Sequence, residues 1–171
     1  MKKYLTLVIF LILAGSLLAQ EKYPVPILTG DQKHENMVFQ YWVMSAVGIS
    51  FAKAHGVTPY EYGKYIGKLF APTWGEGNDF EAYVKGGIYN FECMCTSDAG
   101  LVVKENEDGS VSIRTDDSIW HKIFSEGQGF ASYDEFLEYM KGINEPIADY
   151  MRATITIKRQ DTQLVFTLKK K

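Results

Sequence analysis

The chain contains little cysteine and little histidine, and both shortages narrow its possible chemistry. Its 171 residues include 2 cysteines and 3 histidines. His34-Glu35 has Val38 where a zinc-protease pattern needs a second histidine. Gly-x-Ser-x-Gly elbows, phosphate-binding loops and dinucleotide fingerprints are also missing from the sequence. We therefore expect no cofactor and no metal. A disulfide framework is not needed either, because a chain of this length can bury a core without one.

A large excess of either charge is missing as well. The 18 basic and 21 acidic residues leave a net charge of −3. A mildly acidic chain argues against nucleic acid or an anionic membrane as the main partner. What the sequence does have is apolar surface, because 46% of its residues are hydrophobic and 14% are aromatic. That composition indicates a folded core rather than disorder.

The first nineteen residues resemble a secretory signal peptide. Lys2 and Lys3 precede an uncharged apolar run, and small residues lead up to Ala19. Ser16 stands where a bacterial lipoprotein would need a cysteine to carry lipid. We expect residues 1–19 to be removed near Ala19. Residues 20–171 would then form one exported domain, periplasmic or extracellular, without a membrane anchor and of open oligomeric state.

The first half of the expected domain is helical. A helix is expected over 31–55, and no charged residue occurs between Glu35 and Lys53, which predicts burial on most sides. Thr58 and Glu61 form a capping box for a second helix. Gly63 and Gly67 lie one turn apart in it, so another helix can approach closely there. A third helix is expected to begin near Asp79.

The second half mixes strands with one helix. The expected elements begin with a strand over 91–97 and a hairpin pairing 101–103 with 111–113. Ser132 and Glu135 form a second capping box, which starts a helix that Gly142 and Pro146 break or kink. A last hairpin pairs 153–157 with 164–168. Separate helical and strand regions indicate an α+β fold. Its helical N-terminal half is expected to pack on a small antiparallel sheet with one further helix.

The candidates for catalysis are His121, Asp117 and Cys93. Cys93 and Cys95 would face the same way on a strand, which leaves open two buried thiols, an oxidised pair, or a metal or catalytic role. His121 follows Trp120 in a stretch expected to be irregular, and it is a candidate base. Asp117 is a nearby acid, although acidic pairs in such positions are usually solvated turn residues.

Aromatic residues give the strongest positive signal for a binding site. They concentrate in the helical half, where tyrosine joins an apolar ring to a hydroxyl that needs a partner. Such walls suit a small apolar or aromatic ligand in a preformed cavity, and ordinary core packing is the alternative. The candidate ligand-binding residues are Tyr41, Trp42, Tyr62, Tyr65 and Trp74.

The order of elements resembles that of proteins similar to L-2-amino-thiazoline-4-carboxylic acid hydrolase. These proteins share a helical N-terminal half, a small sheet, and an end on a Thr-rich strand, a turn and a last strand. The matching stretches are residues 91–113 and Met151-Arg152-Ala153-Thr154-Ile155-Thr156-Ile157 through Val165-Phe166. The family's cysteine-bearing segment falls near 116–123, where this chain has no cysteine. The resemblance implies a related cavity-forming α+β fold.

We therefore expect a domain that binds a small apolar or aromatic ligand, or a partner protein, without catalysis. One alternative is a hydrolase of the resembled type, acting on a small molecule through His121, Asp117 or Cys93. The other is a surface protein-interaction domain without a pocket. An apolar cavity ringed by tyrosines would favour ligand binding. A cleft joining His121 to Asp117 or a cysteine would favour the hydrolase, and a solid core with an exposed aromatic patch the third function.

Overall fold

A computed structural model describes residues 26–75, 79–95, 100–127 and 129–171. Its contacts divide the chain into two compact units, residues 1–33 and 34–171. In the first unit, the backbone N–H of Gln32 donates to Thr29 Oγ1 at 3.2 Å, and that of Thr29 donates to Gln32 Oε1 at 3.0 Å. The predicted signal peptide, 1–19, lies outside the described residues. The second unit has the predicted α+β fold.

Helix α2 (Gly30–Ala54) confirms the expected first helix, but the prediction that it is buried on most sides is wrong. Its buried residues share one face: Val38, Trp42, Ser45, Ala46, Ile49 and Ala52. Beside this face runs a row of apolar side chains that are 45–70% exposed, Met37, Tyr41, Met44 and Phe51, which we call the α2 stripe. The neighbouring elements cover only one side of the helix. None of the described helices is long and apolar enough to span a membrane.

Two helices begin at the predicted capping boxes. In α3 (Pro59–Phe70) the Thr58 side chain accepts from the backbone N–H of Glu61, whose side chain accepts from that of Thr58. Ser132 and Glu135 do the same for α6 (Tyr133–Tyr150). Each box satisfies two backbone donors that a helix start leaves free. Both starts are therefore set locally by four residues of sequence.

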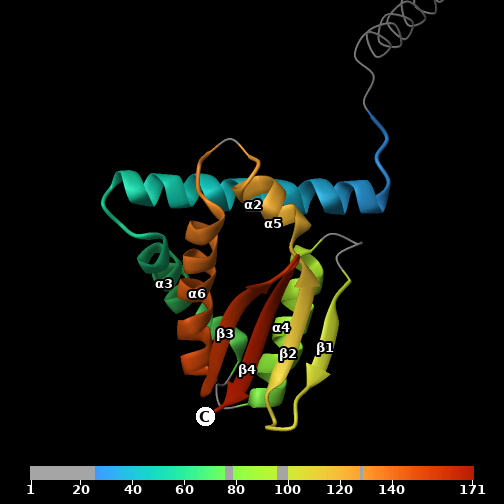
Figure 1. The fold of residues 1–171 in the computed structure, drawn as a ribbon, viewed down its shortest axis with the longest axis vertical. Coiled ribbons are helices and arrows are strands. Elements are labelled where there is room, and N and C mark those ends of the chain that lie inside the picture. Colours follow the sequence, from blue (N-terminus) through green and yellow to red (C-terminus); the bar gives the residue numbers. More distant parts are fainter. Residues whose placement is uncertain (1–25, 76–78, 96–99, 128) are drawn as a thin grey trace, which may run out of the picture. The chain divides into compact units, whose positions relative to one another are not determined.

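Helices α3 and α6 lie side by side in Figure 1, in backbone contact at three glycines that we call the glycine seam, Gly63, Gly67 and Gly142. A Cβ atom added at Gly63 would lie 2.2 Å from the carbonyl oxygen of Tyr139, and one at Gly67 would lie 2.2 Å from that of Ile143. One at Gly142 would lie 2.2 Å from the carbonyl oxygen of Tyr60. The close approach expected from the Gly63–Gly67 spacing is thus confirmed.

A short 3₁₀ helix, η1 (Ala71–Trp74), follows α3, and α4 (Phe80–Met94) begins where Asp79 caps the backbone N–H of Ala82 at 3.0 Å. The predicted strand over 91–97 is wrong, because α4 continues through Met94. Phe91 extends the helical stripe that Tyr83 and Gly87 start at four-residue spacing. A short apolar run does not by itself distinguish helix from strand. Residues 96–99 lie outside the described part of the chain.

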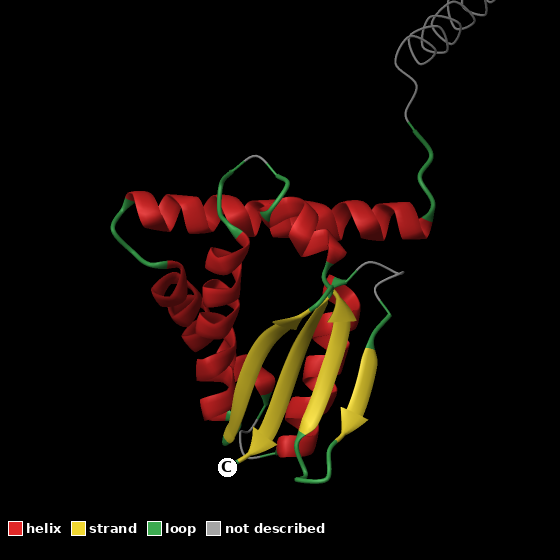
Figure 2. Ribbon diagram, viewed as in Figure 1, coloured by secondary structure: helices red, strands yellow, loops and turns green. Residues whose placement is uncertain are grey.

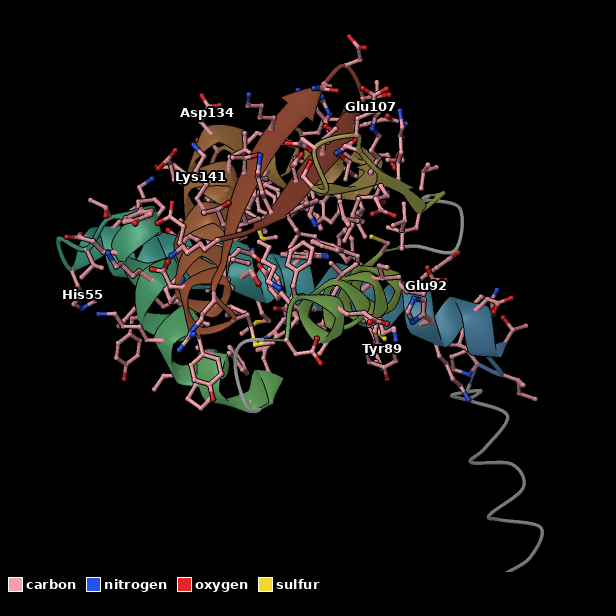
Figure 3. All side chains as sticks on the ribbon, turned by 90° about the horizontal axis from the view of Figure 1, so that it is seen from below. His55, Tyr89, Glu92, Glu107, Asp134 and Lys141 are labelled. Carbon is pink, nitrogen blue, oxygen red and sulfur yellow. The ribbon has the colours of Figure 1, made fainter. Side chains whose placement is uncertain are left out.

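Four antiparallel strands form the sheet: β1 (Val102–Glu105), β2 (Val111–Asp116), β3 (Ala153–Gln160) and β4 (Gln163–Lys170). Their order is β1-β2-β4-β3, and both predicted hairpins are confirmed (Figure 2). Ile113, Phe166 and Ile157 lie in register across one face. Helix α4 covers this face in both views (Figures 1 and 3), and the Phe91 and Phe166 ring centroids lie 4.1 Å apart.

Two further expectations about the second half differ from the structure, the second of them in part. The stretch around His121 is not irregular, because it forms α5 (Ser118–Phe124). Of the break or kink expected at Gly142 and Pro146, the break is wrong, because α6 runs on to Tyr150. Proline removes one helical hydrogen bond and crowds the carbonyl four residues earlier, which here belongs to Gly142. Packing of α6 against α3 and β3 keeps the helix continuous despite that cost.

Candidate functional site

A cavity of about 380 Å³ lies between the helices and the covered face of the sheet, and we call it the helix–sheet cavity. Helices α2, α3, α4 and α6, together with η1, β3 and β4, contribute to its wall. The lining residues are Tyr41, Trp42, Ile66, Phe70, Thr73, Trp74, Tyr83, Gly87, Asn90, Phe91, Met94, Met140, Ile143, Asn144, Ile147, Ile155 and Leu168. None of these residues is acidic, basic or histidine.

Helix α4 turns one face toward the cavity because its lining residues recur every three or four positions, from Tyr83 through Gly87 to Met94. Its opposite side faces solvent. Figure 3 shows Tyr89 and Glu92 pointing away from the sheet, and Tyr89 is 70% exposed. The inner face of α4, which faces the cavity, therefore carries both small and large residues.

Two tryptophans hold the aromatic part of the wall. Trp42 is buried, and its indole N–H donates to the carbonyl oxygen of Met94 at 3.0 Å, which joins α2 to α4. The ring of Trp74 meets that of Tyr83 edge-on, with centroids 5.5 Å apart. A Cβ atom added at Gly86 would lie 2.8 Å from the Trp74 ring, so this glycine lets the ring lie against α4. Packing of the Trp74 ring thus explains why position 86 is glycine.

The cavity wall carries few polar groups. Tyr83 is 1% exposed, and its hydroxyl makes no hydrogen bond to another described residue. Burial raises the pKa of Tyr83 far above the usual tyrosine value, so the hydroxyl keeps its proton at physiological pH. Asn144 donates from Nδ2 to the carbonyl oxygen of Met140 at 2.8 Å, which leaves its Oδ1 as an acceptor. Asn90 adds a half-buried amide.

Of the five residues predicted from the sequence to bind a ligand, Tyr41, Trp42 and Trp74 line the helix–sheet cavity. The other two are not among its lining residues. Tyr62 stacks on Tyr139 with ring centroids 5.6 Å apart, and Tyr65 is 64% exposed.

Sequence reasoning missed the lining residues of α4 and α6. Tyr83 belongs to a helical stripe that is visible in the sequence, and that stripe was the available signal. Asn90 and Asn144 show no such pattern, because half-buried amides on a helix resemble surface residues. Only the packing of α4 and α6 around the same space identifies them.

The structure places Asp117 in an ion pair. This carboxylate is 2% exposed, and its Oδ2 accepts from the Tyr133 hydroxyl at 2.9 Å and lies 2.6 Å from Arg159 Nε. Burial and the hydrogen bond to Asp117 raise the pKa of Tyr133. His121 Nδ1 lies 3.3 Å from the carboxylate of Glu126. Asp117 therefore joins β3 to α5 and α6, and neither Asp117 nor His121 lines the helix–sheet cavity.

The cysteine pair differs from the expectation that both thiols face the same way. Cys93 lies in the last turn of α4 and is exposed, whereas Cys95 follows the helix and is buried. Both are free thiols. Cys95 Sγ lies 3.4 Å from Thr115 Oγ1, and burial raises the pKa of the Cys95 thiol. The interpretation as a buried apolar thiol therefore fits Cys95 and is wrong for Cys93.

Within the described ranges, no group of three or more His, Cys, Asp and Glu side chains is placed to hold a metal ion. Neither a family model, nor a curated protein, nor a solved structure matches this chain. The functional argument therefore depends on the geometry of the helix–sheet cavity.

Proposed function

We propose that residues 34–171 bind a small apolar or aromatic molecule in the helix–sheet cavity. The observation that carries this proposal is a volume of about 380 Å³ lined mostly by aromatic and aliphatic side chains. Ligand sites typically measure roughly 300–1,000 Å³ and combine apolar walls with a few polar groups. The cavity has both properties, with Trp42 and Trp74 as wall and Asn90 and Asn144 as polar groups.

A neutral fluorescent probe tests this proposal. N-phenyl-1-naphthylamine brightens in apolar surroundings, so titration of the folded protein should give saturable binding at one site. Gly87→Met adds a side chain to the cavity wall and should weaken binding at least tenfold. Lys85→Met is the matched control, because it adds the same side chain where Lys85 pairs with Glu81 on the exposed side of α4. Unsaturable binding, or equal binding by both variants, would contradict the proposal.

Export is part of the same proposal, and its support is the pattern of residues 1–19. The protein recovered from its source should begin at Gln20 and carry no lipid. Its intact mass measures both properties at once. Retention of residues 1–19, or an added acyl mass, would contradict the prediction of a cleaved signal peptide without lipid.

A second candidate function, contact with a partner protein, is favoured by the α2 stripe. Exposed rows of large apolar side chains on soluble proteins commonly mark interaction sites. A photo-crosslinking residue at position 44 should then give a discrete adduct in the source cells. The same residue at position 85, on exposed α4, should not. Equal labelling from both positions would remove this candidate.

A further inference from the structure

The wall of the helix–sheet cavity reaches the surface of the protein. Three of its lining residues are exposed, and we call them the cavity mouth: Tyr41 on α2, Phe70 at the end of α3 and Thr73 in η1. Tyr41 is 45% exposed and Phe70 is 55% exposed, so each of these two residues both lines the cavity and meets water. An apolar path therefore leads from the surface into the cavity.

The wall offers little to a charged or strongly polar group. Three of its polar side chains already donate to main-chain carbonyl oxygens: the indole of Trp42 to Met94 at 3.0 Å, the hydroxyl of Thr73 to Phe70 at 2.7 Å, and the amide of Asn144 to Met140 at 2.8 Å. The lining residues contain no acidic, basic or histidine side chain. An ion placed against such a wall loses its water without gaining a counter-ion, which is strongly unfavourable. The interior therefore suits hydrocarbon, and a charged group belongs outside the mouth.

The volume of the cavity exceeds that of a single ring. An apolar cavity of roughly 150 Å³ holds one benzene molecule, so a volume of about 380 Å³ holds roughly 15 carbon atoms in proportion. A compact molecule enclosed by the wall would leave Tyr41 and Phe70 facing water. A chain that continues through the mouth covers both side chains with hydrocarbon and removes their apolar surface from water.

We propose, on the basis of the cavity-binding function above, that the ligand is a single-chain amphiphile. Its hydrocarbon chain, of roughly 12–15 carbons, fills the cavity, and its polar head lies in solvent outside the mouth. Fatty acids and single-chain phospholipids share this chemistry. The far end of the chain reaches the wall near Gly87, which is buried and where an added Cβ would meet only Ile113 Cδ1, at 3.6 Å.

A series of alkanoates from octanoate to hexadecanoate tests the chain, by calorimetric titration at pH 8 below their micelle concentrations. In wild type the Kd should fall roughly fourfold for each added CH₂ group, until the cavity is filled. Gly87→Met places a long side chain at the deep end, so the fall should stop several carbons earlier while octanoate binds as in wild type. Lys85→Met, on the exposed side of α4, is the matched control and should follow wild type.

A second variant tests the mouth. Phe70→Ser should raise the Kd by roughly 3- to 10-fold at every chain length, because the chain loses an apolar contact where it leaves the cavity. Tyr65→Ser is the matched control, since Tyr65 is a 64% exposed ring on the same helix outside the lining, and it should have no effect. Because Phe70 is exposed, this variant does not depend on how the core accommodates Gly87→Met.

Two head groups on the same chain test where the head lies. Tridecanoate and dodecylphosphocholine both carry a twelve-carbon alkyl chain, and they represent a fatty acid and a phospholipid source. Their Kd values should agree within about fivefold, because charges exposed to solvent interact weakly with a protein surface. A larger difference would overturn the placement of the head outside the mouth.

The remaining outcomes separate this inference from the proposed function. If wild type binds N-phenyl-1-naphthylamine but Gly87→Met weakens octanoate as much as the longer alkanoates, the chain is overturned and the cavity stays a site for compact molecules. Equal effects of Phe70→Ser and Tyr65→Ser overturn the mouth. Failure of wild type to bind both the probe and every alkanoate overturns the proposed function, and this inference with it.

Discussion

Glycine residues differ in how closely neighbouring atoms approach them in the glycine seam and beside the helix–sheet cavity. In the seam, an added Cβ would lie 2.2 Å from a carbonyl oxygen of the facing helix, so α3 and α6 touch through their backbones. At Gly87 on α4, the nearest atom to an added Cβ is Ile113 Cδ1 at 3.6 Å, an ordinary contact distance. In the seam, glycine allows two helices to pack closely, whereas α4 has room for a larger residue at position 87.

The difference indicates where the fold is optimised for stability and where it is not. A glycine inside a helix costs about 1 kcal/mol relative to alanine. In the seam, close packing that alanine would prevent offsets that cost. At Gly87 nothing in the surroundings requires glycine, so its cost has no structural compensation. Uncompensated costs of this kind are common where function restricts sequence.

The largest expected effect comes from removing the largest buried ring of the cavity wall. Trp42 is 2% exposed and meets the rings of Trp120 and Phe136 edge-on at 5.6 Å. Trp42→Ala should lower the free energy of unfolding by about 3–5 kcal/mol. Urea unfolding followed by circular dichroism measures it. An unchanged midpoint would show that the ring contributes to binding or contact rather than to the core.

Breaking the seam should have the next largest effect. Gly67→Ala places a methyl group against the Ile143 carbonyl, and overpacking of this kind costs up to about 3 kcal/mol. The same unfolding experiment applies, with Gly30→Ala as a control, because an added Cβ there meets no atom within 4 Å. Equal stability of both variants would contradict the backbone contact between α3 and α6.

Removing the unused hydroxyl should stabilise the protein. Tyr83→Phe should raise the free energy of unfolding by about 1 kcal/mol at pH 7, because it removes a buried unsatisfied group. Burial raises the pKa of Tyr83, so above about pH 10, the usual tyrosine value, the unfolded chain loses this proton while the folded protein keeps it. The wild-type protein therefore loses stability as pH rises from about 10 toward the folded-state pKa, whereas Tyr83→Phe does not. The stability difference between the variant and wild type should therefore widen above pH 10. A loss of stability at pH 7 would show that the hydroxyl has a partner.

The smallest expected effect concerns the space beside Gly87 on α4. Gly87→Ala should stabilise the protein by about 0.5–1 kcal/mol, since alanine favours the helix and its methyl group meets only Ile113. Thermal unfolding resolves a change of this size. A lower melting temperature for this variant would mean that the space beside Gly87 is needed by the fold itself.

Local signals in the sequence predicted most of the elements. The capping boxes at Thr58 and Ser132, and the alternation in both hairpins, depend on residues close in sequence, and the structure confirms them. The end of α4 could not be predicted, because the run from Phe91 suits both helix and strand. Neither could the exposed α2 stripe, because composition does not tell which elements pack on a helix.

The site was less predictable than the fold, for a related reason. Its wall comes from segments as far apart in sequence as Tyr41 and Leu168, and no local pattern joins them. Aromatic clustering identified Trp42 and Trp74 but could not separate them from Tyr65, which is exposed. The resemblance to the thiazoline-carboxylate hydrolases stays a prediction.

Methionine methyl groups offer the most direct test of the helix–sheet cavity as a binding site. Met94 and Met140 line it, whereas Met37 and Met44 lie on the α2 stripe and are 70% and 65% exposed. In protein labelled at the methionine methyls, bound 2-naphthol should give nuclear Overhauser contacts to Met94 and Met140 and none to Met37 and Met44. Contacts to Met37 and Met44 alone would place the ligand on the surface of α2 and contradict the cavity as the functional site.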